Sequence, residues 1–551
     1  MACIKIQKLV LNDDGTIHSG SASIIETTYD SSIRGNSRKR TRERLGKVLY
    51  INDKHTCGIF LSPTRGVVQY DSKTDQFSPV ERDDPRINDP ELFPEPPIHT
   101  IFGDSYLVFC FLKKCGLIDV LRTSFENDTD YEKVLCHLVH GICKNGSHIA
   151  CDDFFKRSFA SYVLPDVPVE RLGSDSPYFE KMGNDKLKVT FFTNFIKYQR
   201  KSNPNFGVGC YVDSTPLPND IRDNPFNALC SHGVSSTSIQ TRLVLVLDES
   251  TGIPVWFDVI PGNLLDLSTI TFIISNVVET LNVRIDSLVL DADYVCKPLI
   301  EMFHLPSETD SDSPDEGEKC RTMLARMPAK RGYPYKQLYN ELKRLISNSK
   351  YQFDRHGHTY FGYCKTVKIF EKYENAYVYV DKDNALELGR QNRMKDTEAY
   401  EKLSMADKNW FDVKFGYFVL ITNKNMTPAD TLDSYFARAD IETVFKTGKE
   451  YLDILPIEKW TAERVKGKLF SDIIEEIAFL FLRKELLGVG IATTRLIGST
   501  SSLMCLKKRN GYIEVEVPNK SVREFYKQLD IEIPSTFSLK AFINNIIKIS
   551  C

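Results

Sequence analysis

One acid, Glu442, stands among an aromatic hydroxyl and two cations at regular spacing. Tyr435 and Arg438 precede it and Lys449 follows it, with intervals of 3, 4 and 7 residues. These intervals are helical repeats, so at about 100° per residue all four fall within roughly 60° of one helix face. Taken alone, a carboxylate flanked by Arg and Lys is more typical of a salt-bridged surface than of a catalytic site.

The helix expected to hold these residues has a strong start signal. Thr427 is the predicted N-cap, Pro428 takes the first helical position, and Asp430 completes a capping box. We therefore predict a helix that begins at this point and continues through the four residues.

Two further acids stand at the ends of apolar runs typical of buried strands. Asp213 ends the run 208–213 and Asp291 ends the run 285–291. Adjacent central strands can place two such ends a few ångströms apart, and a packed helix can bring Glu442 to the same point. Three carboxylates without partners repel one another, so their convergence calls for divalent cations. Oxygen ligands of this kind suit Mg²⁺ or Mn²⁺.

The elements that would position these acids predict a mixed sheet. Runs 208–213, 243–248 and 254–260 read as antiparallel strands, the last two joined by a hairpin turn at 249–252. Asp266 can cap a crossover helix to about residue 281, which makes the strand 285–291 parallel to an earlier one. Residues 321–325 are a fifth strand candidate. These are the parts of an α/β, RNase H-like catalytic core.

The remaining chain divides by composition into further regions. A Pro-rich linker near residue 97 marks one boundary, and helical spacing, a tyrosine-rich β pattern and a second helical stretch mark the others. The predicted regions are an N-terminal region 1–97, a helical domain 98–205, the core 206–331, a β-rich insertion 332–423, the rest of the core with the catalytic helix 424–490, and a C-terminal tail 491–551 of unknown role.

Charge is distributed unevenly along the chain. The formal net charge of −3 argues against a uniformly cationic coat, yet residues 34–47 hold seven cations and one acid. This basic run either binds DNA phosphates nonspecifically or forms a solvated arm, and the sequence favours neither. Residues 307–318 form an acidic, polar stretch expected to be a loop.

Composition also bounds the location of the protein. No run approaches the roughly 18 apolar residues of a membrane span, and the N-terminus lacks the apolar core of a secretory signal. The 14 cysteines include no Cys-x-x-Cys pair, which indicates reduced thiols. Cys136, His140 and Cys143 share one helix face, but core packing is a better interpretation than zinc. We expect a cytoplasmic, nucleoid-associated protein.

The ordered motifs resemble the DDE transposases of bacterial and archaeal insertion sequences, in the RNase H-like, retroviral-integrase superfamily. The resemblance is to the branch with a Tyr-x2-Arg-x3-Glu-x6-Lys signature, which residues 435–449 match completely. It covers roughly residues 100–490, and further stretches similar to the family are 211–215, 252–255, 261–263 with Asp266, 289–294 and 416–423.

The resemblance implies metal-dependent DNA strand cleavage and strand transfer of the cut-and-paste type. Asp213, Asp291 and Glu442 would be the catalytic residues and the ligands of two Mg²⁺ (or Mn²⁺) ions per site. Tyr435, Arg438 and Lys449 would bind DNA phosphates. The partners would be double-stranded DNA, both element ends and target, and a dimer on DNA; members of the branch can pass through a hairpin at the excised end. Trp410 is a candidate for stacking on a flipped base, although core packing is favoured.

One departure and two alternatives stay open. The family usually has Gly two residues after the second acid, where this chain has Asp293; on a strand Asp291 and Asp293 would point the same way, and the resemblance selects Asp291. The chain could instead be a catalytically silent DNA-binding relative that inhibits transposition, which intact acids argue against. It could also be an RNase H-like nuclease, which would not need the Tyr, Arg and Lys frame.

Overall fold

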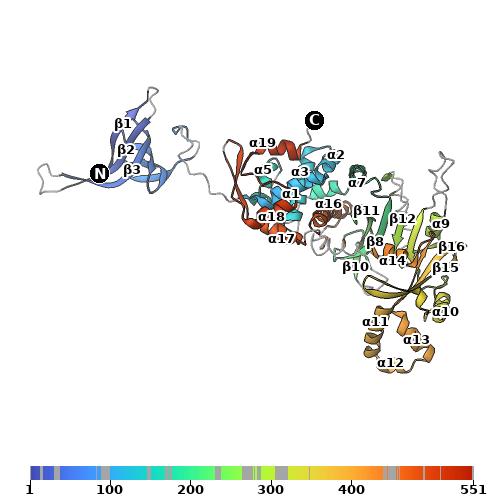
Figure 1. Cartoon of the computed structure of the whole chain (residues 1–551). Helices are drawn as coiled ribbons and strands as arrows, with labels where there is room; N and C mark the ends of the chain where they lie inside the picture. The colour runs from blue at the N-terminus through green and yellow to red at the C-terminus, as the bar shows by residue number, and fades with distance from the viewer. Residues whose placement is uncertain are drawn as a thin grey trace. The chain divides into compact units, whose positions relative to one another are not determined.

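The structure, a computed structural model, is arranged in two compact units, Met1–Ile98 and His99–Cys551 (Figure 1). The structure describes every residue except 1, 13–16, 30–36, 82–83, 88–99, 145–149, 168–171, 173–175, 222, 230–237, 264–272, 274–276, 278–279, 282–286, 305–320, 347, 439–443, 445–454, 456, 458, 488–489, 509 and 549–551.

The first unit is a six-stranded antiparallel sheet whose strands pair in chain order. Its small core contains Ile24, Leu45, Val48, Phe60 and Tyr70, all buried. Much of the basic run therefore lies on a strand, β3, and not on a loose arm. The strands are β1 (Ala2–Leu11), β2 (Ile17–Tyr29), β3 (Ser37–Ile51), β4 (Cys57–Ser62), β5 (Gly66–Asp71) and β6 (Gln76–Pro79).

The second unit begins with helices whose apolar faces form one large core, as the helical spacing predicts. They are α1 (Gly103–Lys114), α2 (Leu117–Ser124), α3 (Asp128–Lys144), α4 (Cys151–Arg157), α5 (Ala160–Val163), α6 (Ser176–Met182) and α7 (Asp185–Gln199). The chain returns to this layer at its C-terminal end through α17 (Thr493–Thr500), α18 (Lys520–Gln528), α19 (Leu539–Phe542) and the π-helical turn η7 (Ile543–Ile547). A small sheet there has the order β20 (Thr536–Ser538), β19 (Tyr512–Val515), β18 (Met504–Lys507) and β7 (Thr100–Ile101).

A ten-stranded mixed sheet follows the helices in sequence. Its first half contains the predicted strands, although β8 continues past Asp213 to Pro218. As predicted, β10 pairs antiparallel with both β8 and β11, and β12 is parallel to an earlier strand, β8; β13, for which no direction was predicted, is parallel to β12. The short β9 pairs with β10. The strands are β8 (Gly209–Pro218), β9 (Ala228–Leu229), β10 (Ile239–Asp248), β11 (Pro254–Pro261), β12 (Ser287–Leu290) and β13 (Thr322–Arg326). Most of the predicted crossover helix, with Asp266, lies outside the described residues.

The segment 332–423 continues this sheet in the order β13-β17-β16-β15-β14, so its strands share one sheet with the core. Its described residues also form four α-helices, of which α11, α12 and α13 lie next to one another (Figure 1). Its elements are α10 (Tyr335–Leu345), η6 (Ser349–Tyr351), β14 (Gln352–Arg355), β15 (His358–Ile369), β16 (Lys372–Asp381), α11 (Lys382–Lys395), α12 (Thr397–Glu401), α13 (Met405–Lys414) and β17 (Tyr417–Thr422). Two short helices, η4 (Ala292–Tyr294) and α9 (Lys297–Phe303), precede β13.

The long helix α16 (Ala462–Leu487) joins the helical layer to the sheet. It contacts α3 and α6 on the helical side and β11 on the sheet side, where Phe470 stacks on Phe257 with ring centroids 5.8 Å apart. Its Gly467 meets the α6 backbone directly: a Cβ atom there would lie 1.7 Å from the carbonyl oxygen of Phe179. Among the described helices, α16 included, none is long and apolar enough to cross a membrane.

Candidate active site

The register of two neighbouring strands brings the first two acids together. The parallel pairing of β12 with β8 runs to Val289, which lies opposite Tyr211. Asp291 and Asp213 each lie two positions later in the sequence than these paired residues. Asp213 lies within β8, and its Oδ1 accepts a hydrogen bond of 2.8 Å from the Ser214 amide. Asp291 lies just past the end of β12, and its Oδ1 accepts one of 2.7 Å from the Ala292 amide.

Two residues of the signature contact the second acid. The Tyr435 hydroxyl donates to Asp291 Oδ1 at 3.4 Å, and Arg438 Nη1 and Nη2 both lie 3.5 Å from Asp291 Oδ2. The Arg438 side chain is 13% exposed, and its guanidinium lies over the Tyr435 ring, 5.3 Å from the centroid. The structure therefore brings Asp213, Asp291, Tyr435 and Arg438 into one cluster.

The hydroxyl groups of Tyr294 and Ser214 form a hydrogen-bond network beside Asp213. The Tyr294 hydroxyl lies 2.6 Å from Ser214 Oγ and 3.4 Å from Asp213 Oδ1. Arg242, on the neighbouring strand β10, donates to Ser214 Oγ at 2.5 Å. No role was predicted for Ser214, Arg242 or Tyr294. Ser214 follows Asp213 and Tyr294 belongs to the stretch 289–294, but these two hydroxyls and Arg242 meet only through the pairing of β8 with β10 and β12.

Burial sets the electrostatics of the cluster. Burial raises the pKa of Asp213, partly offset by the positive charge of Arg438 and by the Ser214 amide, while the charge of Asp291 adds to the rise. Burial also raises the pKa of the Tyr435 hydroxyl to about 12. For Arg438, burial alone would lower the pKa, but Tyr435, Asp291 and Asp213 outweigh it and raise the pKa. The guanidinium thus remains charged beside two acids.

The predicted single helix from residue 428 through Lys449 is not what the structure contains. The capping box is confirmed, since the Asp430 amide donates to Thr427 Oγ1 at 3.1 Å. However, α14 (Pro428–Phe436) ends at Phe436 and Arg438 lies in the turn beyond it. Contacts with Asp291, and not a continuous helix face, unite Tyr435 with Arg438. Glu442 and Lys449 lie outside the described residues.

Side-chain contacts, and not alternation along a strand, distinguish Asp291 from Asp293. The argument from strand alternation fails because β12 ends at Leu290 and both acids belong to a 3₁₀ turn, η4, with Asp291 as its N-cap. Asp291 is the acid that contacts Tyr435 and Arg438. The side chain of Asp293 lies outside the described residues.

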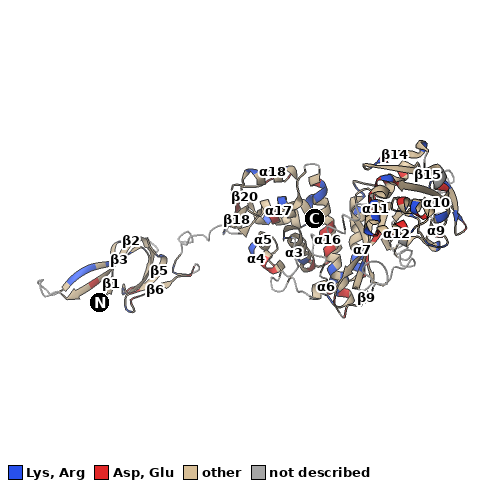
Figure 2. Cartoon of the chain, turned by 90° about the horizontal axis from the view of Figure 1, so that it is seen from below, with Lys and Arg blue, Asp and Glu red and all other residues tan. Residues whose placement is uncertain are grey.

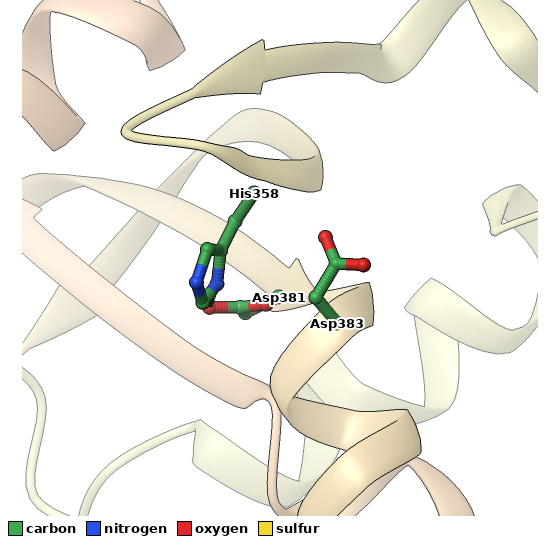
Figure 3. Close-up of side chains that lie close together, drawn as sticks. All are labelled: His358, Asp381 and Asp383. Carbon is green, nitrogen blue, oxygen red and sulfur yellow. Dashed lines mark hydrogen bonds and ion pairs between the residues drawn. The ribbon is translucent and has the colours of Figure 1, made fainter.

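Another set of possible metal ligands occurs on the far part of the same sheet. His358, Asp381 and Asp383 offer ligand atoms that all lie within 4.8 Å of one another, with no other such group of three found among the described residues (Figure 3). Here Asp381 is the N-cap of α11: Oδ1 accepts from the Asn384 amide at 2.9 Å, and Oδ2 lies 2.8 Å from both the Asn384 amide nitrogen Nδ2 and His358 Nδ1. Asp383 Oδ2 accepts from the Thr359 amide at 2.7 Å. This cluster is already satisfied by the protein.

The possible zinc ligands and the possible base-stacking residue named from the sequence both pack against other side chains. Cys136, His140 and Cys143 are buried in the helical core, with the His140 ring edge-on to Phe154. Trp410, on α13, packs edge-on against the Tyr339 ring at a centroid distance of 3.9 Å. All eleven cysteines that the structure describes are free thiols.

The donor set at the acidic cluster fits a hard divalent cation. Asp213 is a desolvated carboxylate that a nearby cation would stabilise, and Asp291 and the Ser214 and Tyr294 hydroxyls add oxygen atoms alongside it. Arg438 Nη1 is buried and has no hydrogen-bond acceptor among the described residues. An oxygen-rich anion placed beside the two acids would supply that acceptor.

Comparisons of this chain with known proteins find matches among solved structures, but none in sequence. No known protein-family profile matches the chain, and no curated protein matches it in sequence. A solved structure, the cryo-EM structure of a piggyBac transposase synaptic complex with hairpin DNA, aligns over 81% of this chain and 84% of that chain, at 11% sequence identity and a TM-score of 0.37. Alignment at this TM-score does not establish a common fold, so the site itself must indicate the function.

Proposed function

We propose that the chain is a DDE-type transposase that cleaves DNA in a metal-dependent reaction and transfers the freed strand. The observation that carries this proposal is the meeting of Asp213 and Asp291 from parallel neighbouring strands, with Arg438 held against them. An acid within one strand and an acid just past the end of its neighbour, beside a buried cation, suit phosphodiester chemistry, which needs metal ligands and a phosphate contact in the same place.

The strand order supports an RNase H-like catalytic core. Three antiparallel strands in chain order, β8, β10 and β11, are extended on the β8 side by β12 and β13, both parallel to β8. In this order β8, the first strand in sequence, lies in the centre of the five, and β12, the fourth of them in sequence, lies beside it. An acid on each of these two central strands is the arrangement that the core requires for catalysis.

Asp213 and Asp291, together with Glu442, would hold two Mg²⁺ or Mn²⁺ ions. Such ions supply an activated attacking oxygen and stabilise the leaving oxygen of an in-line displacement. Arg438 would offer its unsatisfied Nη1 to a phosphate oxygen, and the Tyr435 hydroxyl would lie beside the same phosphate. Lys449 would add a further cation. Tyr294 and Arg242 would fix the Ser214 hydroxyl and, through it, the Asp213 end of the site.

The finer proposal is an insertion sequence of the bacterial or archaeal type, mobilised by cut-and-paste transposition. Its substrates would be the double-stranded ends of the element and a target duplex, and two copies of the chain would act as a dimer on DNA. The protein would work in the cytoplasm, at the nucleoid.

The test uses the purified full chain, Mg²⁺, and duplexes taken from the DNA that flanks its coding sequence. We expect cleavage at an element end and a joined product with a target duplex, both lost when Mg²⁺ is chelated. Glu442→Gln should abolish both products while DNA binding persists, because the amide is a poor metal ligand.

The outcomes separate the competing functions. Cleavage without any joined product would support an RNase H-like nuclease and reject the transposase proposal. DNA binding without cleavage would support a catalytically silent relative. Cleavage retained by Glu442→Gln would remove that residue from the metal site.

A further inference from the structure

The N-terminal unit contains a two-stranded ribbon that extends past its neighbours. Strands β2 and β3 pair as far as Tyr29 opposite Ser37. On one side, the described pairing of β1 with β2 ends at Glu26; on the other, the described pairing of β4 with β3 begins only at Lys47. Residues Thr27–Tyr29 and Ser37–Lys39 therefore pair only with each other among the described parts of this sheet.

The ribbon is strongly cationic. Strand β3 holds six cations and one acid within its 15 residues, and every residue from Ser37 to Arg42 is exposed. Figure 2 shows this basic run along β3. Because alternate residues of a strand point to opposite faces, Arg38 and Arg40 lie on one face of the ribbon and Lys39 on the other.

The acid that lies opposite Arg40 in the ribbon is already paired with another cation. Glu26 lies across the ribbon from Arg40, but its carboxylate binds Arg42 Nη1 at 3.1 Å. Arg42 is further held by Asp75 at 2.5 Å and by the Tyr70 hydroxyl at 3.3 Å. Arg42 is thus an anchor of the sheet, and Arg38, Lys39 and Arg40 have no carboxylate partner among the described residues.

Resting on the proposed function, we infer that this β2–β3 ribbon is a duplex-DNA-binding element. Two strands are about 4.8 Å apart, and a two-stranded ribbon fits the roughly 12 Å major groove of B-DNA. Cations on both faces suit a ribbon between two phosphate backbones better than one lying flat on a single backbone. The Tyr29 side chain, 77% exposed at the end of the pairing, adds an aromatic group at the same place. The ribbon would position the chain on DNA apart from the acidic cluster.

The test compares two triple variants of the full chain with equal loss of charge. Arg38→Ala, Lys39→Ala and Arg40→Ala remove the ribbon cations, while Lys5→Ala, Lys54→Ala and Lys73→Ala remove three exposed lysines of the same unit. Affinity for a labelled 30-base-pair duplex is measured by fluorescence anisotropy over a range of salt concentrations.

We expect the ribbon triple to weaken duplex binding at least about tenfold near 0.15 M salt and to reduce the slope of log affinity against log salt by about 2 to 3, since each phosphate contact contributes about 0.9. The lysine triple should leave the slope within about one of the parent value. Equal losses in the two triples would overturn the inference, as would a ribbon triple that binds like the parent.

The inference and the proposed function can fail separately. If the parent protein cuts and joins DNA but the ribbon triple binds and reacts like it, the ribbon has no DNA role. If the parent protein never cuts DNA but the ribbon triple alone loses duplex affinity, the ribbon inference stands and the transposase proposal falls. A ribbon triple that lost affinity for duplex RNA as steeply as for duplex DNA would overturn the assignment to the B-form major groove.

Discussion

Two clusters of acids lie on one ten-stranded sheet, and they differ in how their oxygen atoms are already used. Asp381 and Asp383, beside His358, are satisfied by backbone and side-chain donors at the start of α11. Asp213 and Asp291 each accept a short hydrogen bond from the next amide, and their other contacts are at 3.4–3.5 Å. By ligand distance the first cluster is the better metal site, yet the second leaves more for an incoming ligand to satisfy.

The difference shows why proximity of acids is a weak guide to function. At the start of α11, the carboxylate of Asp381 closes a helix end, a structural task that consumes its lone pairs. Where Asp213 on β8 faces the end of β12, burial raises the pKa of Asp213 and a guanidinium with an unsatisfied Nη1 lies nearby. The candidate active site is distinguished by a buried polar atom without a hydrogen-bond partner in the described part of the chain, Arg438 Nη1, and not by the number of its acids.

The largest effect is expected when one acid of each cluster is replaced and the cleavage rates of the two variants are compared. Asp213→Asn should lower metal-dependent cleavage by about 10³-fold or more, because losing a metal ligand removes several kcal/mol of transition-state stabilisation. Asp383→Asn keeps a carbonyl acceptor for the Thr359 amide and should cleave like the parent protein. Initial cleavage rates at saturating Mg²⁺ measure both. Loss of activity in Asp383→Asn alone would move the active site to the α11 cluster.

A smaller effect is expected in the stability of the α11 cluster. Asp381→Ala removes the N-cap of α11 and the partner of His358, and should lower the free energy of unfolding by about 1–2 kcal/mol. Asp381→Asn should retain most of the stability, because Asn is an equally good N-cap. Chemical denaturation measures the difference. If the Ala and Asn variants were equally stable, the cap would not be the structural role of this residue.

The smallest effect is a gain in stability at the candidate site. Because burial raises the folded-state pKa of Asp213, its ionisation opposes folding as the pH rises through the unfolded pKa near 4. Above the folded pKa this cost is complete. At pH 7 without metal, Asp213→Asn should therefore raise the free energy of unfolding. The gain should disappear near pH 3. A variant less stable than the parent at pH 7 would show that Asp213 is not strained by burial.

The half of the sheet that holds the candidate active site was predictable because its signals are local. Apolar runs end at Asp213 and Asp291, a turn lies at 249–252, and a helical crossover implies that the strand before Asp291 is parallel to an earlier strand, which the structure shows to be β8. The capping box at Thr427 was equally clear. The end of α14 at Phe436 was not, because the 3- and 4-residue periodicity continues beyond it and only tertiary contacts hold Arg438 against Asp291.

The basic run illustrates the same division in the first unit. Its charge is visible in the sequence, but the positions of Arg38, Lys39 and Arg40 depend on the strand pairing that turns the run into a ribbon and assigns Arg42 to Glu26 and Asp75. Likewise, the sequence places β-rich segments after residue 332, but only long-range pairing joins them to the core sheet.

The sequence by itself determined the strands in the first half of the sheet, the start of α14, the three spaced acids and the cations around one of them, because periodicity, capping and turn chemistry act over a few residues. The tertiary structure alone decided which acids meet, which oxygens are already satisfied and which cation remains incompletely paired. Those properties depend on strand register and burial between residues more than 70 positions apart, such as Asp213 and Asp291, and no local pattern encodes them.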